Sequence, residues 1–378
     1  MKSNKKVFLL GPAHPFRGGI ADTQNQLAQN LKLLGYQVFV YTFTKQYPNF
    51  FFPGKTQFSD EQPPNAIKIE RKIHSYKPTN WNKVAQTINA EKPDTVIFRY
   101  WSPVLAPCWA GIARNLGKEI KKIGLIDNWK PHEKKPWDSL LTRIFYKQMN
   151  GFATLSSAVG LQIESTLPNS QVWKGFHPIA DKLPPAIPQE KARKILGWPE
   201  NKKIVLFFGL VRKYKGLDLL ITAFSKPPLN KSDVVLAIVG EAYESEKKYT
   251  EMIESLALKD RVLLDFNYAT TEKARIVFSA ADLVAQTYRN ATQSGVTPLA
   301  YHFQVPLLVS DIPGLKTPVL EDSTGEICKI DPLEIAERLS FMFSGDVLTQ
   351  CKSAFLKVKN KYHWRTFGKS LMAFINQI

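Results

Sequence analysis

Residues 6–20 read KVFLLGPAHPFRGGI, an apolar run that breaks at Gly11-Pro12 and continues into a loop that ends with a glycine pair. The run predicts a buried strand at residues 6–10. In residues 20–34 the core-facing positions recur at helical spacing, which predicts a helix. Gly35 is a residue type that commonly ends a helix, and residues 38–43 are predicted to form a second strand. A strand, a helix and a second strand within about 40 residues form a βαβ unit, which implies a parallel sheet with helices on its faces.

The same alternation continues through most of the chain. Further strands are predicted at residues 95–98, 122–126 and 152–155. Between His177 and Pro199 the chain contains Pro178, Pro184, Pro185 and Pro188 with scattered charge, which favours a linker. Strands then resume at residues 204–208, 234–239, 262–266, 283–286 and 305–310. Residues 332–378 are mostly helical, with a break near residues 362–364. The sequence therefore predicts an α/β protein with two doubly wound, Rossmann-like parallel-sheet domains.

Length and cysteine content agree with two domains in a reducing compartment. The 378 residues are 44% hydrophobic, enough for two or three cores. No apolar run approaches the roughly 18 residues of a membrane helix, and the N-terminus lacks the pattern of a signal peptide. Cys108, Cys328 and Cys351 are far apart and form no C-x-x-C motif, so neither a disulfide framework nor a zinc cluster is expected. We expect a cytoplasmic protein.

The charge is strongly basic. Lys and Arg total 51 against 33 Asp and Glu, a net charge of +18, which predicts attraction to nucleotides, anionic lipid or nucleic acid. The lysines are spread along the whole chain, and no arginine-rich arm or aromatic-interleaved basic strand is visible. Nucleic acid is therefore not expected as a partner.

Parallel sheets bind ligands beyond the carboxyl ends of their strands. The loop after the first strand contains Gly18 and Gly19, which leave the following helix N-terminus open to an anion. A tight turn between strand and helix is the alternative reading. Neither glycine belongs to a G-x-G-x-x-G or P-loop motif.

Two loops of the second half are further candidates for an anion site. Arg212 and Lys215 lie between a strand end and Gly216, where one guanidinium and one ammonium group can hold a diphosphate, although loop cations are often simply solvated. Pro298 places a helix start at residues 294–297, with free N–H groups beside Gly295, although an ordinary capped helix fits as well. The three loops together predict a nucleotide diphosphate held between the two halves.

Five motifs in order resemble the family-4 glycosyltransferases of the GT-B fold over nearly the whole chain. They are Gly18-Gly19, G-x-x-R-x-x-K-G ending at Gly216, Val239-Gly240-Glu241, Ala281-Asp282-Leu283 and the helix leading to residues 305–311. The resemblance implies an acceptor-binding domain over residues 1–180 and a nucleotide-sugar domain over 181–362. It also implies a terminal helix over 363–378 that packs back on the first domain.

The resemblance further implies a retaining, metal-independent transfer of a sugar from a nucleotide-diphosphate sugar, with no cofactor. The absence of an Asp-x-Asp triplet agrees with this. The implied catalytic residues are His132, Arg212 and Lys215. Donor-binding residues would be Gly18, Gly19, Arg212, Lys215, Gly240, Glu241, Thr292, Gln293, Ser294 and Gly295.

The chain departs from the family at two positions. Family members usually carry two glutamates eight positions apart near the start of the third loop's helix, and Ala291 and Leu299 stand there instead. Thr292, Gln293 and Ser294 are neutral groups that can bind sugar hydroxyls. The two substituted positions are those at which the family's glutamates would contact the sugar and the ribose of the donor.

The first half supplies residues for the acceptor side. His132 follows a buried strand and is placed to hold the donor sugar or to exchange a proton with the acceptor, and Glu133 is placed to orient it. Asp127 and Asn128 open the same loop. Trp101 is a candidate for stacking on an acceptor sugar, although a tryptophan in this place is more often part of the core. His14 and His177 are weaker candidates, whereas His74, His302 and His363 are expected to be structural.

We therefore expect a glycosyltransferase of envelope polysaccharide or glycolipid synthesis, with a glycan or lipid-linked acceptor. An anionic membrane surface, at the inner face of the cytoplasmic membrane, is a further candidate partner. A GT-B nucleotide-sugar epimerase and a non-catalytic protein that binds nucleotide sugars or glycans are the alternatives. The non-catalytic alternative is motivated by the missing glutamates.

Overall fold

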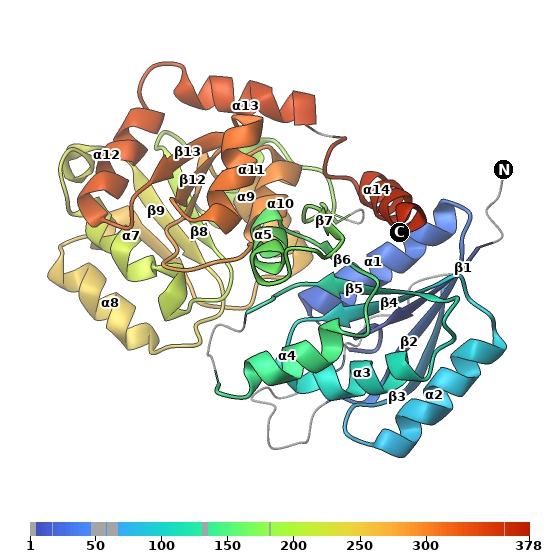
Figure 1. The fold of residues 1–378 in the computed structure, drawn as a ribbon. Helices are drawn as coiled ribbons and strands as arrows, with labels where there is room; N and C mark the ends of the chain where they lie inside the picture. Colours follow the sequence, from blue (N-terminus) through green and yellow to red (C-terminus); the bar gives the residue numbers. More distant parts are fainter. Residues whose placement is uncertain are drawn as a thin grey trace. The chain divides into compact units, whose positions relative to one another are not determined.

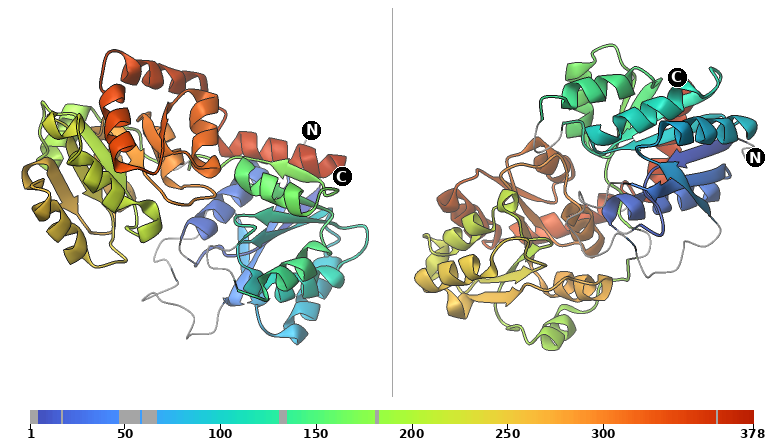
Figure 2. Two further views of the ribbon diagram at one scale, coloured as in Figure 1. Left: turned by 60° about the vertical axis from the view of Figure 1, so that its left-hand side comes forward. Right: turned by 90° about the horizontal axis from the view of Figure 1, so that it is seen from below.

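The computed structural model describes residues 5–16, 18–46, 58, 67–130, 135–180, 183–358 and 360–378. Its internal contacts divide the chain into two compact units. The first unit contains Met1–Ala180 together with His363–Ile378, and the second contains Asp181–Tyr362. Each unit is a parallel sheet with helices on both faces (Figures 1 and 2).

The first unit has a seven-stranded sheet with the order β3-β2-β1-β4-β5-β6-β7. Chain order therefore reverses between β1 and β4, the position at which open α/β sheets form their binding crevice. The strands are β1 (Lys6–Leu10), β2 (Gln37–Lys45), β3 (Lys68–His74), β4 (Thr95–Tyr100), β5 (Lys121–Ile126), β6 (Gly151–Thr154) and β7 (Val172–Lys174).

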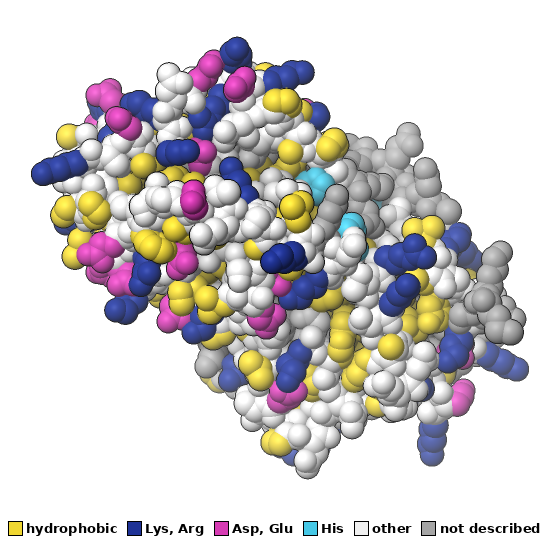
Figure 3. Space-filling model, turned by 90° about the horizontal axis from the view of Figure 1, so that it is seen from above, with side chains coloured by type: hydrophobic (Ala, Val, Ile, Leu, Met, Phe, Trp, Pro, Cys, Tyr) yellow, Lys and Arg dark blue, Asp and Glu magenta, His cyan; other side chains and the backbone are white. Residues whose placement is uncertain are grey.

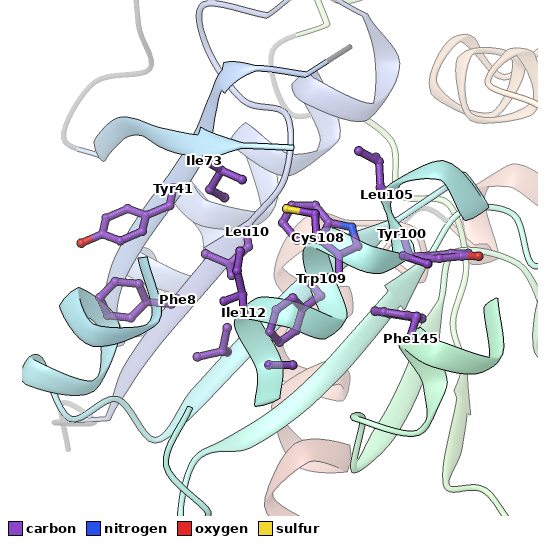
Figure 4. Packing of buried hydrophobic residues seen from close by; sticks show 14 of the residues in the cluster. Phe8, Leu10, Tyr41, Ile73, Tyr100, Leu105, Cys108, Trp109, Ile112 and Phe145 are labelled. Atoms are coloured by element: carbon purple, nitrogen blue, oxygen red, sulfur yellow. The ribbon is translucent and has the colours of Figure 1, made fainter. Parts of the chain in front are cut away.

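Successive side chains of β1 alternate between the two faces of this sheet and contribute to the core on each face. Phe8 and Leu10 point to one face, where they pack with Trp109 and other apolar side chains (Figure 4). Val7 and Leu9 point to the opposite face. Because both faces are covered, the strand reads as a continuous apolar run.

The helices of the first unit cover those two faces. On one face, α2 (Pro78–Ala90) packs against α3 (Ala106–Arg114), and α3 packs against α4 (Asp138–Tyr146). On the other face, α1 (Gly19–Leu33) packs against the last helix of the chain, α14 (Trp364–Gln377) (Figure 1). The remaining elements are α5 (Ser157–Thr166) and the short 3₁₀ helix η2 (Pro103–Leu105).

The second unit has a six-stranded sheet with the order β10-β9-β8-β11-β12-β13. Its chain order reverses between β8 and β11, which marks a second crevice position. The strands are β8 (Ile204–Phe208), β9 (Val235–Val239), β10 (Val262–Asp265), β11 (Leu283–Gln286), β12 (Leu307–Ser310) and β13 (Gly325–Cys328).

Helices again cover both faces of the second sheet. Val205 and Phe207 of β8 pack in the core with residues of α7, α8 and α12, whereas Phe208 meets Phe278 of α9. The helices are α6 (Gln189–Leu196), α7 (Leu217–Phe224), α8 (Glu246–Ser255), α9 (Thr271–Ala280), α10 (Val296–Phe303), α11 (Pro313–Asp322), α12 (Pro332–Met342) and α13 (Val347–Val358), and the 3₁₀ helices are η3 (Lys213–Lys215), η4 (Leu229–Lys231) and η5 (Lys259–Arg261).

The predicted linker was wrong in part, because α6 lies inside it. This helix begins after Pro188 and ends at Gly197, which has the left-handed backbone (φ 65°) common after helix ends. The Arg193 side chain is buried against Asp282 at 2.8 Å, so α6 is packed onto the second unit. The prolines that suggested a linker precede the helix rather than interrupt it.

Among the helices of the described residues, none combines the length and apolar character needed to cross a bilayer. Within the same ranges, no group of three or more His, Cys, Asp and Glu side chains is arranged to hold a metal ion. Cys108, Cys328 and Cys351 are buried free thiols. Lys and Arg side chains are scattered over the face shown in Figure 3, interspersed with Asp and Glu.

Candidate active site

Two glycine loops meet at the carboxyl ends of β8 and β9 in the second unit. Gly240 has a φ of 144°, and a Cβ at this position would lie 2.3 Å from the carbonyl oxygen of Gly209. The Val211 N–H donates to the Glu241 carbonyl at 2.9 Å, which fixes the two loops side by side. Gly240 thus permits close backbone approach, while the Glu241 side chain is exposed.

Lys215 is a buried cation beside these loops. Its side chain lies over the ring of Tyr288, with Nζ 5.5 Å from the ring centre, and the residue is 8% exposed. In the part of the chain that the structure describes, no carboxylate forms an ion pair with it. Burial, and secondarily the charge of Arg212, lowers the pKa of Lys215 from its ordinary value to about 8. Among the described residues, the ammonium group therefore has no anionic partner of the kind that a buried charge requires.

The backbone around Lys215 is held by the neighbouring loop at the end of β11. Gly216 has a left-handed conformation (φ 64°), and a Cβ there would lie 2.0 Å from the Thr287 carbonyl oxygen. The Thr287 hydroxyl donates to the Gly216 carbonyl at 3.0 Å. Arg289 forms two bonds of 2.7 Å to the carboxylate of Asp218 on α7. These contacts fix the position of Lys215 from both sides.

We expect Gly216→Ala to lower the free energy of unfolding by about 2 kcal/mol or more, since a left-handed backbone alone costs a non-glycine residue about 1–2 kcal/mol and the methyl would also strike Thr287. Gly295→Ala is the matched control, because a Cβ there meets nothing within 4 Å. Chemical denaturation of both variants measures the difference. Equal stabilities would contradict the close packing of Gly216 on Thr287.

Arg212 lies three residues before Lys215 and is exposed. Its guanidinium carbon is 4.7 Å from the ring centre of Tyr243, a cation–π contact that orients the side chain. A buried ammonium and an exposed guanidinium therefore lie in one short loop.

The N-terminus of α10 borders the same loops. A Cβ at Gly209 would lie 3.1 Å from Lys215 Nζ and 3.7 Å from Cγ2 of Val296, so the ammonium and the helix start flank one glycine. Gly295 is the N-cap of α10, as the sequence predicts, and the Ser294 hydroxyl accepts the Val296 N–H at 3.2 Å. Pro298 contributes no N–H. The remaining N–H groups of the first turn have no acceptor within the helix.

Both positions at which the resembled family carries carboxylates are neutral here, one before α10 and one within it. Ala291 is buried and Leu299 is half-buried. Oε1 of Gln293 is buried and has no hydrogen-bond partner among the described residues. Ser294 is buried and hydrogen-bonds with the Tyr288 hydroxyl at 3.2 Å, and Thr292 is half-buried. The structure thus brings Gly240, Lys215 and residues 291–295 to one edge of the second sheet.

In the first unit, Gly18 and Gly19 form the start of α1. Gly18 has a φ of 110°, which favours glycine, and a Cβ at either position would meet nothing within 4 Å. Both residues are exposed. The first turn of α1 is therefore open, as an anion-binding helix start requires.

A buried polar cluster at the ends of β4 and β5 was missed by the sequence analysis. Arg99 donates to both carboxylate oxygens of Asp127, at 2.5 and 2.6 Å, and to the Thr23 hydroxyl at 3.0 Å. The third nitrogen of Arg99 and both side-chain amide atoms of Gln24 are buried and have no partner among the described residues. Gly11 admits both side chains, since a Cβ there would meet them at 2.6 and 3.2 Å.

The acceptor-side candidates have different environments. Asp127 is 4% exposed, and both its oxygens are engaged by Arg99, which leaves it a structural partner rather than an open base. Asn128 is half-buried, and Trp101 packs edge-on against Phe43 at the core. His132 and Glu133 lie outside the described residues. Burial lowers the pKa of His177 below its ordinary value, so this histidine is neutral near pH 7.

The sequence of the second unit matches the model of a known protein family. Residues 188–352 match the family model described as "Glycosyl transferases group 1". The D-inositol 3-phosphate glycosyltransferase of Xylanimonas cellulosilytica is 28% identical over 174 residues, which cover 44% of this chain and 41% of that protein. The enzyme of that name from Mycolicibacterium smegmatis is 25% identical over 37% of this chain and 32% of its own length. The chain thus matches less than half the length of these curated relatives.

Solved structures match over nearly the entire chain. Sucrose-phosphate synthase from Thermosynechococcus elongatus has a TM-score of 0.76 at 16% identity, covering 99% of both chains. HepE from Anabaena, solved in complex with UDP, has a TM-score of 0.74 at 18% identity and covers 99% of this chain and 100% of its own. At these identities the likeness shows the fold alone.

Proposed function

We propose that this GT-B protein, whose second unit carries a glycosyl transferases group 1 domain, transfers a sugar from a nucleotide-diphosphate sugar to a glycan or lipid-linked acceptor with retention of anomeric configuration. The observation that carries the proposal is Lys215. It is a buried cation with no ion pair to a described carboxylate, next to the N-terminus of α10. A diphosphate supplies the missing negative charge.

The proposed chemistry is electrostatic. As the bond between the sugar and the diphosphate breaks, negative charge accumulates on the leaving phosphate. Lys215, Arg212 and the N–H groups of the first turn of α10 stabilise that charge more than they stabilise the intact donor. Because Lys215 and Arg212 are already oriented by Tyr288 and Tyr243, little reorganisation is needed when the charge develops.

In this proposal no metal ion and no cofactor is needed. The donor sugar and ribose are bound by neutral groups in place of the family's two glutamates. Thr292, Gln293 and Ser294 precede α10, and the unpaired Oε1 of Gln293 is an acceptor suited to a sugar hydroxyl. Gly240 and Glu241 border the same edge. This arrangement favours a donor whose hydroxyls are recognised without ionic hydrogen bonds.

The acceptor is assigned to the first unit. His132, Glu133, Asn128 and Trp101 remain the proposed acceptor-side residues. Gly18 and Gly19, which form an open helix N-terminus, remain proposed donor-binding residues. The names of the curated relatives make D-inositol 3-phosphate a reasonable first acceptor to assay.

A non-catalytic donor-binding protein is the second candidate, favoured by the apolar residues Ala291 and Leu299. It predicts nucleotide-sugar binding without turnover. An epimerase would instead convert the donor in the absence of any acceptor.

Thermal shift and hydrolysis assays with a panel of nucleotide sugars test the proposal, beginning with UDP-sugars because HepE was solved with UDP. We expect the correct donor to raise the melting temperature, since a ligand selective for the folded state stabilises it, and to be consumed when an acceptor is added. Failure of every nucleotide and nucleotide sugar to shift the melting temperature would contradict the diphosphate site. Binding without consumption would favour the non-catalytic candidate.

A further inference from the structure

Arg99 links three elements of the first unit at the position where the chain order of the sheet reverses. It lies on β4, which neighbours β1 at that reversal. Its guanidinium donates to both carboxylate oxygens of Asp127, which follows β5, and to the Thr23 hydroxyl on α1 at 3.0 Å. All three side chains are buried. We call Arg99, Asp127 and Thr23 the Arg99 network.

Thr23 extends the Arg99 network to the start of α1. Its hydroxyl oxygen lies 2.7 Å from the Gly19 carbonyl oxygen and 3.0 Å from that of Ile20. Carbonyl oxygens only accept, so the hydroxyl donates its proton to them and accepts from Arg99. Gly18 and Gly19 do little to restrict their own backbone, and a Cβ at either would meet nothing within 4 Å. The Thr23 hydroxyl therefore holds a turn that the glycines themselves do not fix.

Stability alone does not account for the Arg99 network. Replacing a buried ion pair by apolar side chains is often neutral or stabilising, so the fold gains little from pairing Arg99 with Asp127. The third nitrogen of Arg99 and both amide atoms of Gln24, which follows Thr23 on α1, are buried and have no partner among the described residues. Buried polar groups with a purely structural role are normally hydrogen-bonded. The incomplete pairing, at a crevice position of the sheet, indicates a functional role.

We propose that Arg99 is a positioning residue for the substrate-binding residues of the first unit. Through Thr23 it orients the first turn of α1, and through Asp127 it fixes the start of the loop that continues into Asn128. On the proposed function, on which this role rests, the glycine pair of α1 binds the donor and Asn128 lies on the acceptor side. Arg99 acts through its two partners, since its own side chain is buried.

Thr23→Val tests the link to α1, because valine keeps the shape of threonine and removes the hydroxyl. We expect kcat for sugar transfer to fall about tenfold, with a smaller change in the donor KM, since misdirected N–H groups stabilise the developing charge less well. Thr23→Ser, which keeps the hydroxyl, should retain a kcat close to that of the wild type. Thr87→Val is the matched control, since Thr87 of α2 also donates to the carbonyl four residues earlier, at 2.9 Å, but on an exposed face. An unchanged kcat in Thr23→Val, or an equal loss in Thr87→Val, would overturn the proposal.

The double variant Arg99→Met/Asp127→Leu separates positioning from stability. Because it replaces both members of the buried pair by apolar groups, we expect a melting temperature near that of the wild type but a kcat lower by about tenfold or more. A purely structural pair predicts the opposite result, in which the folded variant retains its kcat. Wild-type kcat in the folded double variant would therefore rule out a positioning role for Arg99.

Hydrogen exchange of the Asp22 amide measures the first turn of α1 without any substrate. This amide donates to the Gly18 carbonyl at 3.0 Å. We expect it to exchange about tenfold faster in Thr23→Val than in the wild type or Thr23→Ser, the scale of one lost charge-assisted hydrogen bond. Unchanged exchange would contradict the link between Arg99 and α1. Faster exchange in the variant of a protein that binds no nucleotide sugar would instead contradict the proposed function while supporting that link.

Discussion

Lys215→Met is expected to lower the rate of sugar transfer by about a hundredfold or more, the scale seen when one preorganised charge-stabilising group is removed, and at the same time to raise the melting temperature. The ammonium group is buried without an ion pair to a described carboxylate. It therefore loses part of its hydration free energy when the chain folds. Methionine keeps the apolar stem in contact with Tyr288 and removes the charge. The residue that assists transfer is therefore one that weakens the fold.

The pH dependence of the free energy of unfolding gives an independent measure of how much the buried Lys215 charge destabilises the fold. Because the pKa of Lys215 falls to about 8 in the folded protein, the unfolded chain binds more protons between that pH and the ordinary lysine pKa of 10.5. The Lys215 contribution to stability therefore rises with pH across this window and is unfavourable below it. We expect the stability advantage of Lys215→Met to be largest below pH 8 and to shrink as the pH rises.

Lys213→Met is the matched control, since Lys213 is exposed two residues away in the same loop. Its stability and transfer rate should remain close to those of the wild type. Donor-induced thermal shifts and initial rates, measured for both variants, complete the test. Wild-type transfer in Lys215→Met would remove this residue from the mechanism, and a lower melting temperature would contradict the unpaired state of its charge.

Arg99→Met is expected to destabilise the protein by about 3–5 kcal/mol, the usual penalty for breaking a buried ion pair by removing one partner. Arg99 and Asp127 are 1% and 4% exposed and share two short hydrogen bonds. Without the guanidinium, the Asp127 carboxylate remains buried and uncompensated. Urea denaturation of the variant at neutral pH measures the loss.

The double variant Arg99→Met/Asp127→Leu should recover most of that stability, because replacing both members of a buried pair by apolar groups is often nearly neutral. A double variant as unstable as Arg99→Met would show that the loss arises from packing rather than from the unpaired carboxylate. Arg114→Met, which changes an exposed arginine of the same unit, should leave stability unchanged.

The buried central strands were the most predictable part of the fold. Runs such as Ile204–Phe208 and Leu283–Gln286 are buried throughout and almost entirely apolar because both sheet faces are covered. The structure has these strands at the predicted bounds. The predicted GT-B fold is confirmed by the solved structures that match both units. The strands that escaped prediction, β3, β7 and β13, are at or near sheet edges. In β3, exposed Lys68 and Arg71 interrupt the apolar pattern.

The candidate site was predictable where it depends on backbone. Gly216 and the start of α10 were recognised because glycine and proline mark special backbone positions, whereas Gly240 was recognised through the family resemblance. The pairing of Arg99 with Asp127 was not recognised, because it joins two strands that become neighbours only in the folded sheet. An arginine at the end of the apolar strand 95–100 was the available signal. The environments of His132 and Glu133 lie outside the described residues.

The return of α14 to the first unit has a consequence for synthesis of the chain. Trp364, Phe367 and Leu371 complete the core on the α1 face, and Lys121 donates to the Ile375 carbonyl at 2.7 Å. These residues follow the whole second unit in the chain, so the first unit cannot complete this part of its core before the second unit has been translated. Until then the apolar face of α1 is uncovered, and transiently exposed apolar surface of this kind is prone to aggregation.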